Sequence, residues 1–231
     1  NWNSGGTISN NATVVSTDAI TTMCQYSQKL VIASALGKLG SWDGLTWVLY
    51  NAGAGLCDNA TLIGAASINS VFTMTDKDGG PTLVAAGAGG KLGSMKLYNG
   101  ITWATASLPF SDPNGSAYGN GIYIISSNSG KVAISIDGNS WEAITVPGAL
   151  YLGAICYGNG LFVMLEYLGP GLGSRSWISA NGRTWIHGTS NCGSRIVYGQ
   201  GKYLSAATLS GGNEIFSSLD GLTWNLIYTS T

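Results

Sequence analysis

Charged side chains are scarce in this chain of 231 residues. They make up 9% of the sequence, against about 25% in ordinary globular proteins. The 10 Lys and Arg nearly balance the 11 Asp and Glu, which leaves a net charge of −1, and the basic residues are scattered along the chain. Because no basic stripe could neutralise a phosphate backbone, the sequence predicts no nucleic-acid partner.

Long hydrophobic runs are also missing. The longest apolar segments, such as residues 160–169 (GLFVMLEYLG), reach about half of the ~20 residues that a membrane-spanning helix needs. No leader with basic, apolar and small-residue regions opens the chain. We therefore expect a soluble protein, or a processed or excised piece of one, without membrane insertion.

Metal-ligating residues are few. His187 is the only histidine, and the four cysteines show neither CxxC nor Cys/His spacing. We therefore expect no metal site and no cofactor. The cysteines are expected to be buried as small apolar residues. One or two disulfides are the alternative if the protein works outside a cell. The four residues are Cys24, Cys57, Cys156 and Cys192.

Proline and strong helix formers are sparse, whereas glycine is abundant, with 35 residues against 5 prolines. Together with frequent Ser, Thr and Asn, this composition favours many short strands joined by tight turns. One short stretch recurs five times: residues 41–47 (SWDGLTW), 97–103 (LYNGITW), 135–141 (SIDGNSW), 179–185 (SANGRTW) and 218–224 (SLDGLTW). Its acid or amide position recurs at intervals of 56, 38, 44 and 39 residues, which is typical of propeller blades.

A second element precedes most of these turns, as in residues 117–126 (AYGNGIYIIS) and 156–165 (CYGNGLFVML). Each unit then contains four strands: a Gly-Asn-Gly corner joins the first two, and an Asp-Gly corner joins the last two. Both corners are expected to be two-residue type I′ turns, which need positive φ at both central residues. The repeat positions, with their Trp expected to fill the seams between blades, are Asp43, Trp47, Asn99, Trp103, Asp137, Trp141, Asn181, Trp185, Asp220 and Trp224.

The predicted fold is all-β, a single five-bladed β-propeller of four-stranded antiparallel blades. The propeller spans residues 21–231, with blades near 21–50, 68–108, 116–147, 152–189 and 194–231. Residues 1–20 are expected to form an arm, a linker or a closing strand, and the sequence does not choose among these.

The repeat resembles the Asp-box or BNR-type repeat of sialidases and related propellers, in which Ser, Asp, Gly and Trp mark the turn between the third and fourth strands. It departs from that pattern because the acid and the glycine are adjacent in all five copies. The chain is nearer to the YGNG…DGxTW propeller repeats found in phage tail and bacterial surface proteins. This resemblance implies the fold and a surface-recognition role.

Two kinds of enzyme fit the sequence poorly. A sialidase needs three arginines from different blades, but Arg175, Arg183 and Arg195 lie within 21 residues of one another. A five-bladed glycosidase needs paired carboxylates around its channel. The expected innermost strands carry no Asp or Glu, and only three acids lie near one of them: Asp18, Asp76 and Asp78.

A binding module fits better, because the loops expected on the edge opposite the corners carry neutral hydrogen-bonding and aromatic side chains. The candidate glycan-binding residues are Trp42, Asp58, Asn59, Asp112, Asn114, Asn128, Tyr151, Glu166, Tyr167, Asn191 and Asn213. Trp42 is included because its aromatic ring is not repeated in every blade, although packing between blades also accounts for it.

The sequence thus favours a non-catalytic, lectin-like propeller that recognises cell-surface glycans. We expect it outside the cell or on a virion surface, where it could serve as a phage receptor-binding component. A structural or assembly propeller that docks another protein of a virion or surface appendage is the alternative, and a five-bladed glycosidase is the third possibility.

Overall fold

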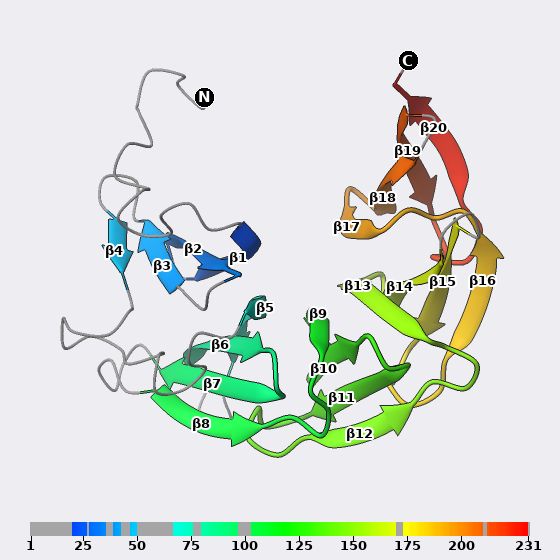
Figure 1. Cartoon of the computed structure of the whole chain (residues 1–231). Helices are drawn as coiled ribbons and strands as arrows, with labels where there is room; N and C mark the ends of the chain where they lie inside the picture. The colour runs from blue at the N-terminus through cyan, green and yellow to red at the C-terminus, as the bar shows by residue number, and fades with distance from the viewer. Residues whose placement is uncertain are drawn as a thin grey trace, which may run out of the picture. The chain divides into compact units, whose positions relative to one another are not determined.

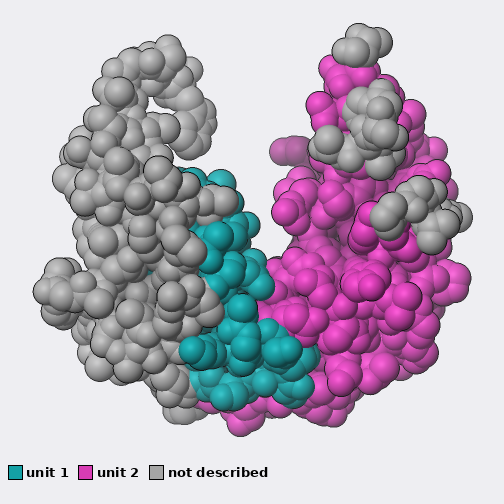
Figure 2. Space-filling model, in the orientation of Figure 1, with its two compact units in different colours: residues 1–111 teal, residues 112–231 magenta. Residues whose placement is uncertain are grey.

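The computed structural model describes residues 20–26, 28–35, 39–42, 47–49, 67–75, 80–96, 103–169, 173–209 and 212–230. These residues contain twenty strands and no helix. The strands form five sheets of four antiparallel strands, each in chain order, and these five propeller blades confirm the predicted all-β fold class (Figure 1). Residues 1–111 and 112–231 form two compact units, coloured teal and magenta in Figure 2.

Unit 1 holds the first two blades. Blade 1 contains β1 (Ile20–Tyr26), β2 (Lys29–Ser34), β3 (Leu39–Trp42) and β4 (Trp47–Leu49). Blade 2 contains β5 (Ile68–Thr75), β6 (Pro81–Gly87), β7 (Lys91–Lys96) and β8 (Trp103–Ser107). One core joins them, because Val31 and Leu39 of blade 1 pack in the same buried cluster as Leu83 of blade 2.

Unit 2 holds the other three blades. Blade 3 contains β9 (Pro113–Gly119), β10 (Ile122–Ser127), β11 (Lys131–Ser135) and β12 (Glu142–Thr145). Blade 4 contains β13 (Tyr151–Gly158), β14 (Leu161–Gly169), β15 (Gly173–Ser179) and β16 (Ile186–Ser190). Blade 5 contains β17 (Arg195–Gly199), β18 (Lys202–Leu209), β19 (Gly212–Ser218) and β20 (Asn225–Thr229). The first strands β9, β13 and β17 lie side by side in this order.

The corner between the first and second strands is a type I′ turn in blades 3 to 5, as expected. Asn120 and Gly121 have φ of 50° and 74°, and the pairs Asn159/Gly160 and Gln200/Gly201 repeat this geometry. Asparagine and glycine tolerate positive φ better than other residues do, which explains their place here.

The corner between the third and fourth strands corrects the prediction. Gly138, Gly182 and Gly221 have positive φ, but the acid or amide before each of them does not. These corners are longer loops held by side chains rather than two-residue type I′ turns. In blade 3, Ser135 Oγ accepts the Gly138 N–H at 2.8 Å, and Asp137 Oδ1 accepts the Asn139 and Ser140 N–H groups, both at 2.8 Å.

In blades 4 and 5, the corner glycine lies against the preceding blade. A Cβ on Gly182 would lie 2.7 Å from Ile124 Cδ1 of blade 3, and one on Gly221 would lie 2.6 Å from Val163 Cγ2 of blade 4. The Trp of the same repeat lies at this seam as well. Trp224 Nε1 donates to Ser176 Oγ of blade 4 at 3.1 Å. The repeat therefore shapes the turn and packs one blade onto the next.

A second contact between blades recurs at the Tyr-Gly corner. The Tyr157 ring of blade 4 occupies the place where a Cβ on Gly119 of blade 3 would lie, and the Tyr198 ring of blade 5 does the same at Gly158 of blade 4. Neither glycine has positive φ. Close approach of the aromatic ring, and not backbone conformation, is what requires glycine at these two positions.

Candidate functional site

A cavity of about 520 Å³ opens in unit 2 at the edge of the sheets opposite the hairpin corners. Residues from all three blades line it: from β9, from the turn between β10 and β11, from β13 and β14, and from the start of β17. They are Asn114, Asn128, Tyr151, Gly153, Leu165, Glu166, Tyr167, Gly169, Gly193, Ser194 and Arg195. The three glycines leave space that larger side chains would fill.

Two tyrosines form the aromatic part of this cavity. Tyr151 on β13 is paired directly with Tyr167 on β14. Directly opposed residues of an antiparallel pair project from the same face of the sheet, about 5 Å apart. The two side chains remain 51% and 50% exposed, which leaves two aromatic rings available to a ligand.

Two asparagines supply neutral hydrogen-bonding groups. Asn114 Nδ2 donates to Asn128 Oδ1 at 2.9 Å and to the Leu152 carbonyl at 3.2 Å. Within the described residues, no partner takes Asn114 Oδ1 or Asn128 Nδ2. One acceptor and one donor group are therefore left next to each other for a ligand.

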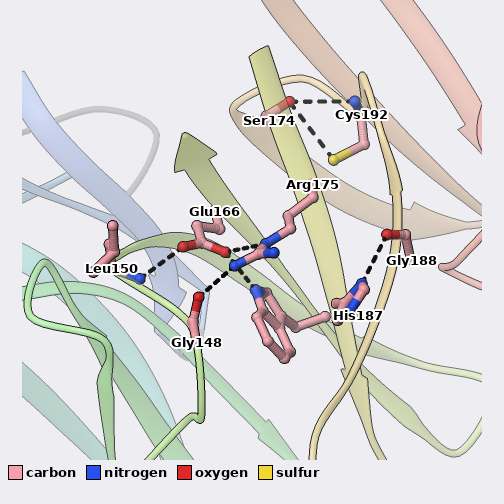
Figure 3. Close-up of polar contacts among 9 residues, drawn as sticks. Gly148, Leu150, Glu166, Ser174, Arg175, His187, Gly188 and Cys192 are labelled. Atoms are coloured by element: carbon pink, nitrogen blue, oxygen red, sulfur yellow. Dashed lines mark hydrogen bonds and ion pairs between the residues drawn. The ribbon is translucent and has the colours of Figure 1, made fainter. Parts of the chain in front are cut away.

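Glu166 is buried beneath this surface, with its side chain fully enclosed. Its Oε2 accepts Arg175 Nε at 2.6 Å and Trp177 Nε1 at 2.7 Å, and its Oε1 accepts the Leu150 N–H at 2.7 Å (Figure 3). Arg175 also donates to the Gly148 carbonyl, at 2.5 Å. The carboxylate thus ties the connection between β12 and β13 to the middle of blade 4, and both of its oxygens accept donors from within the protein.

The structure brings five of the candidate glycan-binding residues together in this cavity: Asn114, Asn128, Tyr151, Glu166 and Tyr167. Asp112 is next to them, because its carbonyl accepts the Asn128 N–H at 3.2 Å, but it does not line the cavity. Asn191, in the connection between β16 and β17, and Asn213 on β19 also lie outside its lining.

Other candidate residues cannot be placed. Asp58 and Asn59 lie outside the described residues, as do the repeat positions Asp43 and Asn99 and the acids Asp18, Asp76 and Asp78. Trp42, Trp47 and Trp103 are described as strand positions only.

Arg195 also lines the cavity, although it is not among the predicted glycan-binding residues. In the sequence it is one of three arginines that lie too close together in the chain for a sialidase triad. The sequence feature that could have identified Arg195 as a binding residue is its position, because it is the only Lys or Arg in the expected inner strands of blades 3 to 5.

A smaller cavity of about 330 Å³ lies at the opposite edge, near the corner of blade 3. Arg183 of blade 4 spans it with a two-pronged ion pair to Glu142 of blade 3, at 2.9 and 2.6 Å. Both side chains are about half exposed. Arg183 donates to Glu142 and thereby lowers the pKa of that carboxyl.

Three cysteines are described, and all are free thiols: Cys24, Cys156 and Cys192. Burial raises their pKa, to about 12 for Cys24 and Cys156 and to about 11 for Cys192. Cys57 lies outside the described residues. Among the residues described, no group of three or more His, Cys, Asp or Glu could hold a metal ion.

The carboxylates of Asp137 and Asp220, in the corners of blades 3 and 5, are expected to contribute to the stability of the fold at low pH. Donation by the Ser140 and Asn139 N–H groups lowers the pKa of Asp137. At Asp220, partial burial acts to raise the pKa, but the Thr223 and Leu222 N–H groups and two hydroxyls outweigh it, so this pKa is lowered too. Because the folded pKa lies below the unfolded one, the charged carboxylates stabilise the fold above about pH 4. That stabilisation is lost as the pH falls through the folded pKa.

Blade 4 provides the matched comparison, because Asn181 Oδ1 accepts the Arg183 and Thr184 N–H groups at 2.9 and 3.0 Å in the same turn. We expect the double variant Asp137→Asn/Asp220→Asn to fold. At pH 7 its free energy of unfolding should fall by no more than about 1 kcal/mol per site, since solvent screens both exposed turns. Between about pH 4 and pH 2 it should lose less stability than the wild type. Urea unfolding across this range tests the expectation, which parallel curves for the two proteins would contradict.

Comparisons with known proteins agree with the fold. No family model matches the chain, and no curated protein is similar to it in sequence. Among solved structures, streptogramin B lyase has a TM-score of 0.69 at 12% identity, with 92% of this chain and 69% of that chain aligned. YCF48 bound to the D1 peptide has a TM-score of 0.62 at 18% identity, with 91% and 67% aligned.

The extracellular domain of a putative one-component system from B. thetaiotaomicron has a TM-score of 0.63 at 12% identity. That match covers 92% of this chain but only 28% of the bacterial chain. Among the described residues, no helix is long and apolar enough to span a membrane. At these identities the likeness is one of fold, and the chain has the architecture of a β-propeller.

Proposed function

We propose that this protein is a non-catalytic, lectin-like propeller that binds glycans in the cavity of unit 2. One observation carries the proposal: two half-exposed tyrosines, paired across β13 and β14, stand beside an unpartnered amide donor and acceptor at a cavity of about 520 Å³. A sugar ring offers an apolar C–H face to aromatic rings and hydroxyls to amides. Aromatic faces with a few convergent polar groups are typical of small-ligand sites.

A non-catalytic role is supported by the carboxylates of this cavity. Glycoside hydrolysis needs two carboxyl groups about 5 to 10 Å apart, one of them free to transfer a proton. Glu166 is the only acid among the described lining residues, and its two oxygens already accept three N–H donors. Neither a second carboxylate nor a free one lines the part of the cavity that the structure describes.

The repeat pattern extends the proposal to location. The Asp-box-like turns and YGNG corners resemble those of phage tail and bacterial surface propellers, and one structural neighbour is an extracellular domain. Display outside the cell or on a virion surface would let several copies act together. Multivalent display raises the apparent affinity of weak sites without any new contact.

Removal of either tyrosine should weaken saccharide binding. We expect Tyr151→Ala and Tyr167→Ala each to lower the affinity about five- to tenfold for any saccharide that the wild type binds on a glycan array, because loss of a stacking ring is worth about 1 to 1.5 kcal/mol. Titration calorimetry measures the affinity. Tyr228→Ala is the matched control, since Tyr228 is 54% exposed on β20 and does not line the cavity. Equal losses in all three variants, or no binding by the wild type, would count against the proposal.

Docking of a protein partner is the second candidate. Its support is that YCF48, one of the structural neighbours, is seen bound to a peptide. A stable complex with one protein of a virion or surface appendage, formed by a chain without saccharide affinity, would favour this candidate over the first.

A further inference from the structure

Two of the three arginines in unit 2 are paired with a carboxylate of the protein, and the third is not. Arg175 is paired with Glu166 at 2.6 Å, and Arg183 with Glu142 at 2.6 Å. Arg195 lines the cavity and is exposed. Within the described residues, no carboxylate pairs with its guanidinium group and no acceptor takes the N–H groups of that side chain. We propose that the saccharide bound in this cavity carries an anionic group, a carboxylate or a sulfate, and that Arg195 binds this group.

This inference rests on the proposed glycan-binding function and names the class of its ligand. The described lining residues contain two charged side chains, Glu166 and Arg195. Arg175 compensates the charge of Glu166 from within the blade. Arg195 therefore leaves one uncompensated positive charge at the cavity. A guanidinium presents a planar fork of N–H donors that matches the paired oxygens of an oxyanion.

The strand pattern argues against an architectural role for Arg195. Counted back from the glycine that ends each first strand, Arg195 on β17 corresponds to Gly115 on β9 and Ala154 on β13. A Cβ on Gly115 would lie 2.6 Å from the Gly153 carbonyl of the next blade. The blade architecture thus uses a small residue at this position, and the long cationic side chain of blade 5 is an exception that packing does not require.

Asp112 carries a further charge near the cavity, since its carbonyl accepts the Asn128 N–H. Ser129 Oγ, in the turn between β10 and β11, donates to Asp112 Oδ1 at 3.3 Å, and Asp112 does not line the cavity. It lies on the blade 3 side, whereas Arg195 begins blade 5. An anion bound at Arg195 would approach from the blade 5 side, while the tyrosines of blade 4 contact the sugar ring.

Binding measurements on three oligosaccharides of similar length test the inference. We would titrate the wild type with a uronic-acid oligomer, a sulfated oligomer and a neutral oligomer at about 50 mM and about 300 mM salt. We expect at least tenfold tighter binding of one acidic oligomer than of the neutral one, and the preferred arm distinguishes carboxylate from sulfate. The preference should shrink at the higher salt, because salt screens an exposed ion pair.

The variants Arg195→Gln and Arg195→Lys distinguish an effect of Arg195 itself from an effect of the net charge of the protein. Arg195→Gln should abolish the preference for the acidic oligomer with less than a threefold change for the neutral one, and Arg195→Lys should retain part of the preference. Arg183→Gln changes the net charge of the protein equally but lies at the opposite edge, so it should leave the preference unchanged.

The outcomes separate the two proposals. Equal binding of neutral and acidic oligomers, with no effect of Arg195→Gln, would overturn the anionic ligand and leave the glycan-binding function standing. Equal loss of preference in Arg195→Gln and Arg183→Gln would assign it to overall charge and overturn the role of Arg195. No binding of any saccharide would overturn both proposals.

Discussion

Replacement of Glu166 by Gln is expected to lower the free energy of unfolding by about 3 kcal/mol. The carboxylate is fully enclosed and accepts three N–H donors from Arg175, Trp177 and Leu150. A glutamine amide would offer one acceptor oxygen and would place its own N–H groups against these donors. Removal of one partner of a buried ion pair costs about 3 to 5 kcal/mol. The lower end applies because 23% of the Arg175 side chain is exposed.

Glu142→Gln is the matched control for this prediction. The Glu142–Arg183 pair has the same shortest distance, 2.6 Å, but its side chains are 54% and 53% exposed. Exposed ion pairs add little to stability, because water solvates the separated charges well. Guanidinium unfolding followed by tryptophan fluorescence should show a large shift of the midpoint for Glu166→Gln and little for Glu142→Gln. Similar shifts in both variants would show that burial does not set the strength of the Glu166 pair.

Gly158→Ala is expected to cost at least about 3 kcal/mol, because the new methyl group would overlap the Tyr198 ring. Its distance to the ring atoms would be well below 3.0 Å. The ring cannot move aside easily, since it packs against Tyr203 with 4.8 Å between ring centroids, and Tyr203 Oη donates to the Gly158 carbonyl. Overpacking of this kind in a dense core usually costs about 1 to 3 kcal/mol, and more where the neighbours are fixed.

Two further variants test the cause of that loss. Gly199 occupies the same strand position in blade 5, and among the described atoms nothing lies within 4 Å of a Cβ built there, so Gly199→Ala should change stability little. In Gly158→Ala/Tyr198→Ala the clash is removed, and this double variant should be no less stable than Tyr198→Ala alone. Additive losses in the double variant would refute the steric explanation, because residues in contact should show a coupling energy.

The site could be predicted only in part from the sequence. Asn114, Asn128, Tyr151 and Tyr167 were predicted from loops expected at the edge opposite the corners, and these residues do line one cavity. Asn213 has the same kind of sequence context but lies elsewhere, on blade 5. Residues from β9, β13 and β17 meet only through the packing of neighbouring blades, and a linear sequence does not contain these distances.

For the charged residues Glu166 and Arg195, the sequence likewise could not show which one has an ion-pair partner. Both are isolated charged residues in weakly charged segments, and the sequence offers no means to tell which one is paired. In the structure, Arg175 lies opposite Glu166 across β14 and β15 and neutralises it. Arg195 pairs in register with Ala206, which carries no charge. Strand register, rather than composition, decides which charge remains available to a ligand.

By itself, the sequence determined the five-fold repeat, the four-strand blades and the all-β class. These follow from local chemistry: Asn-Gly pairs form type I′ turns, and alternating apolar residues form half-buried strands. The tertiary structure determined the features that depend on side-chain contacts and on packing between blades. It showed that the Asp-Gly corners are held by serine and aspartate side chains, that Gly119 and Gly158 make room for a tyrosine of the next blade, and which loop residues share a cavity. These features depend on contacts between blades, where residues about forty positions apart meet.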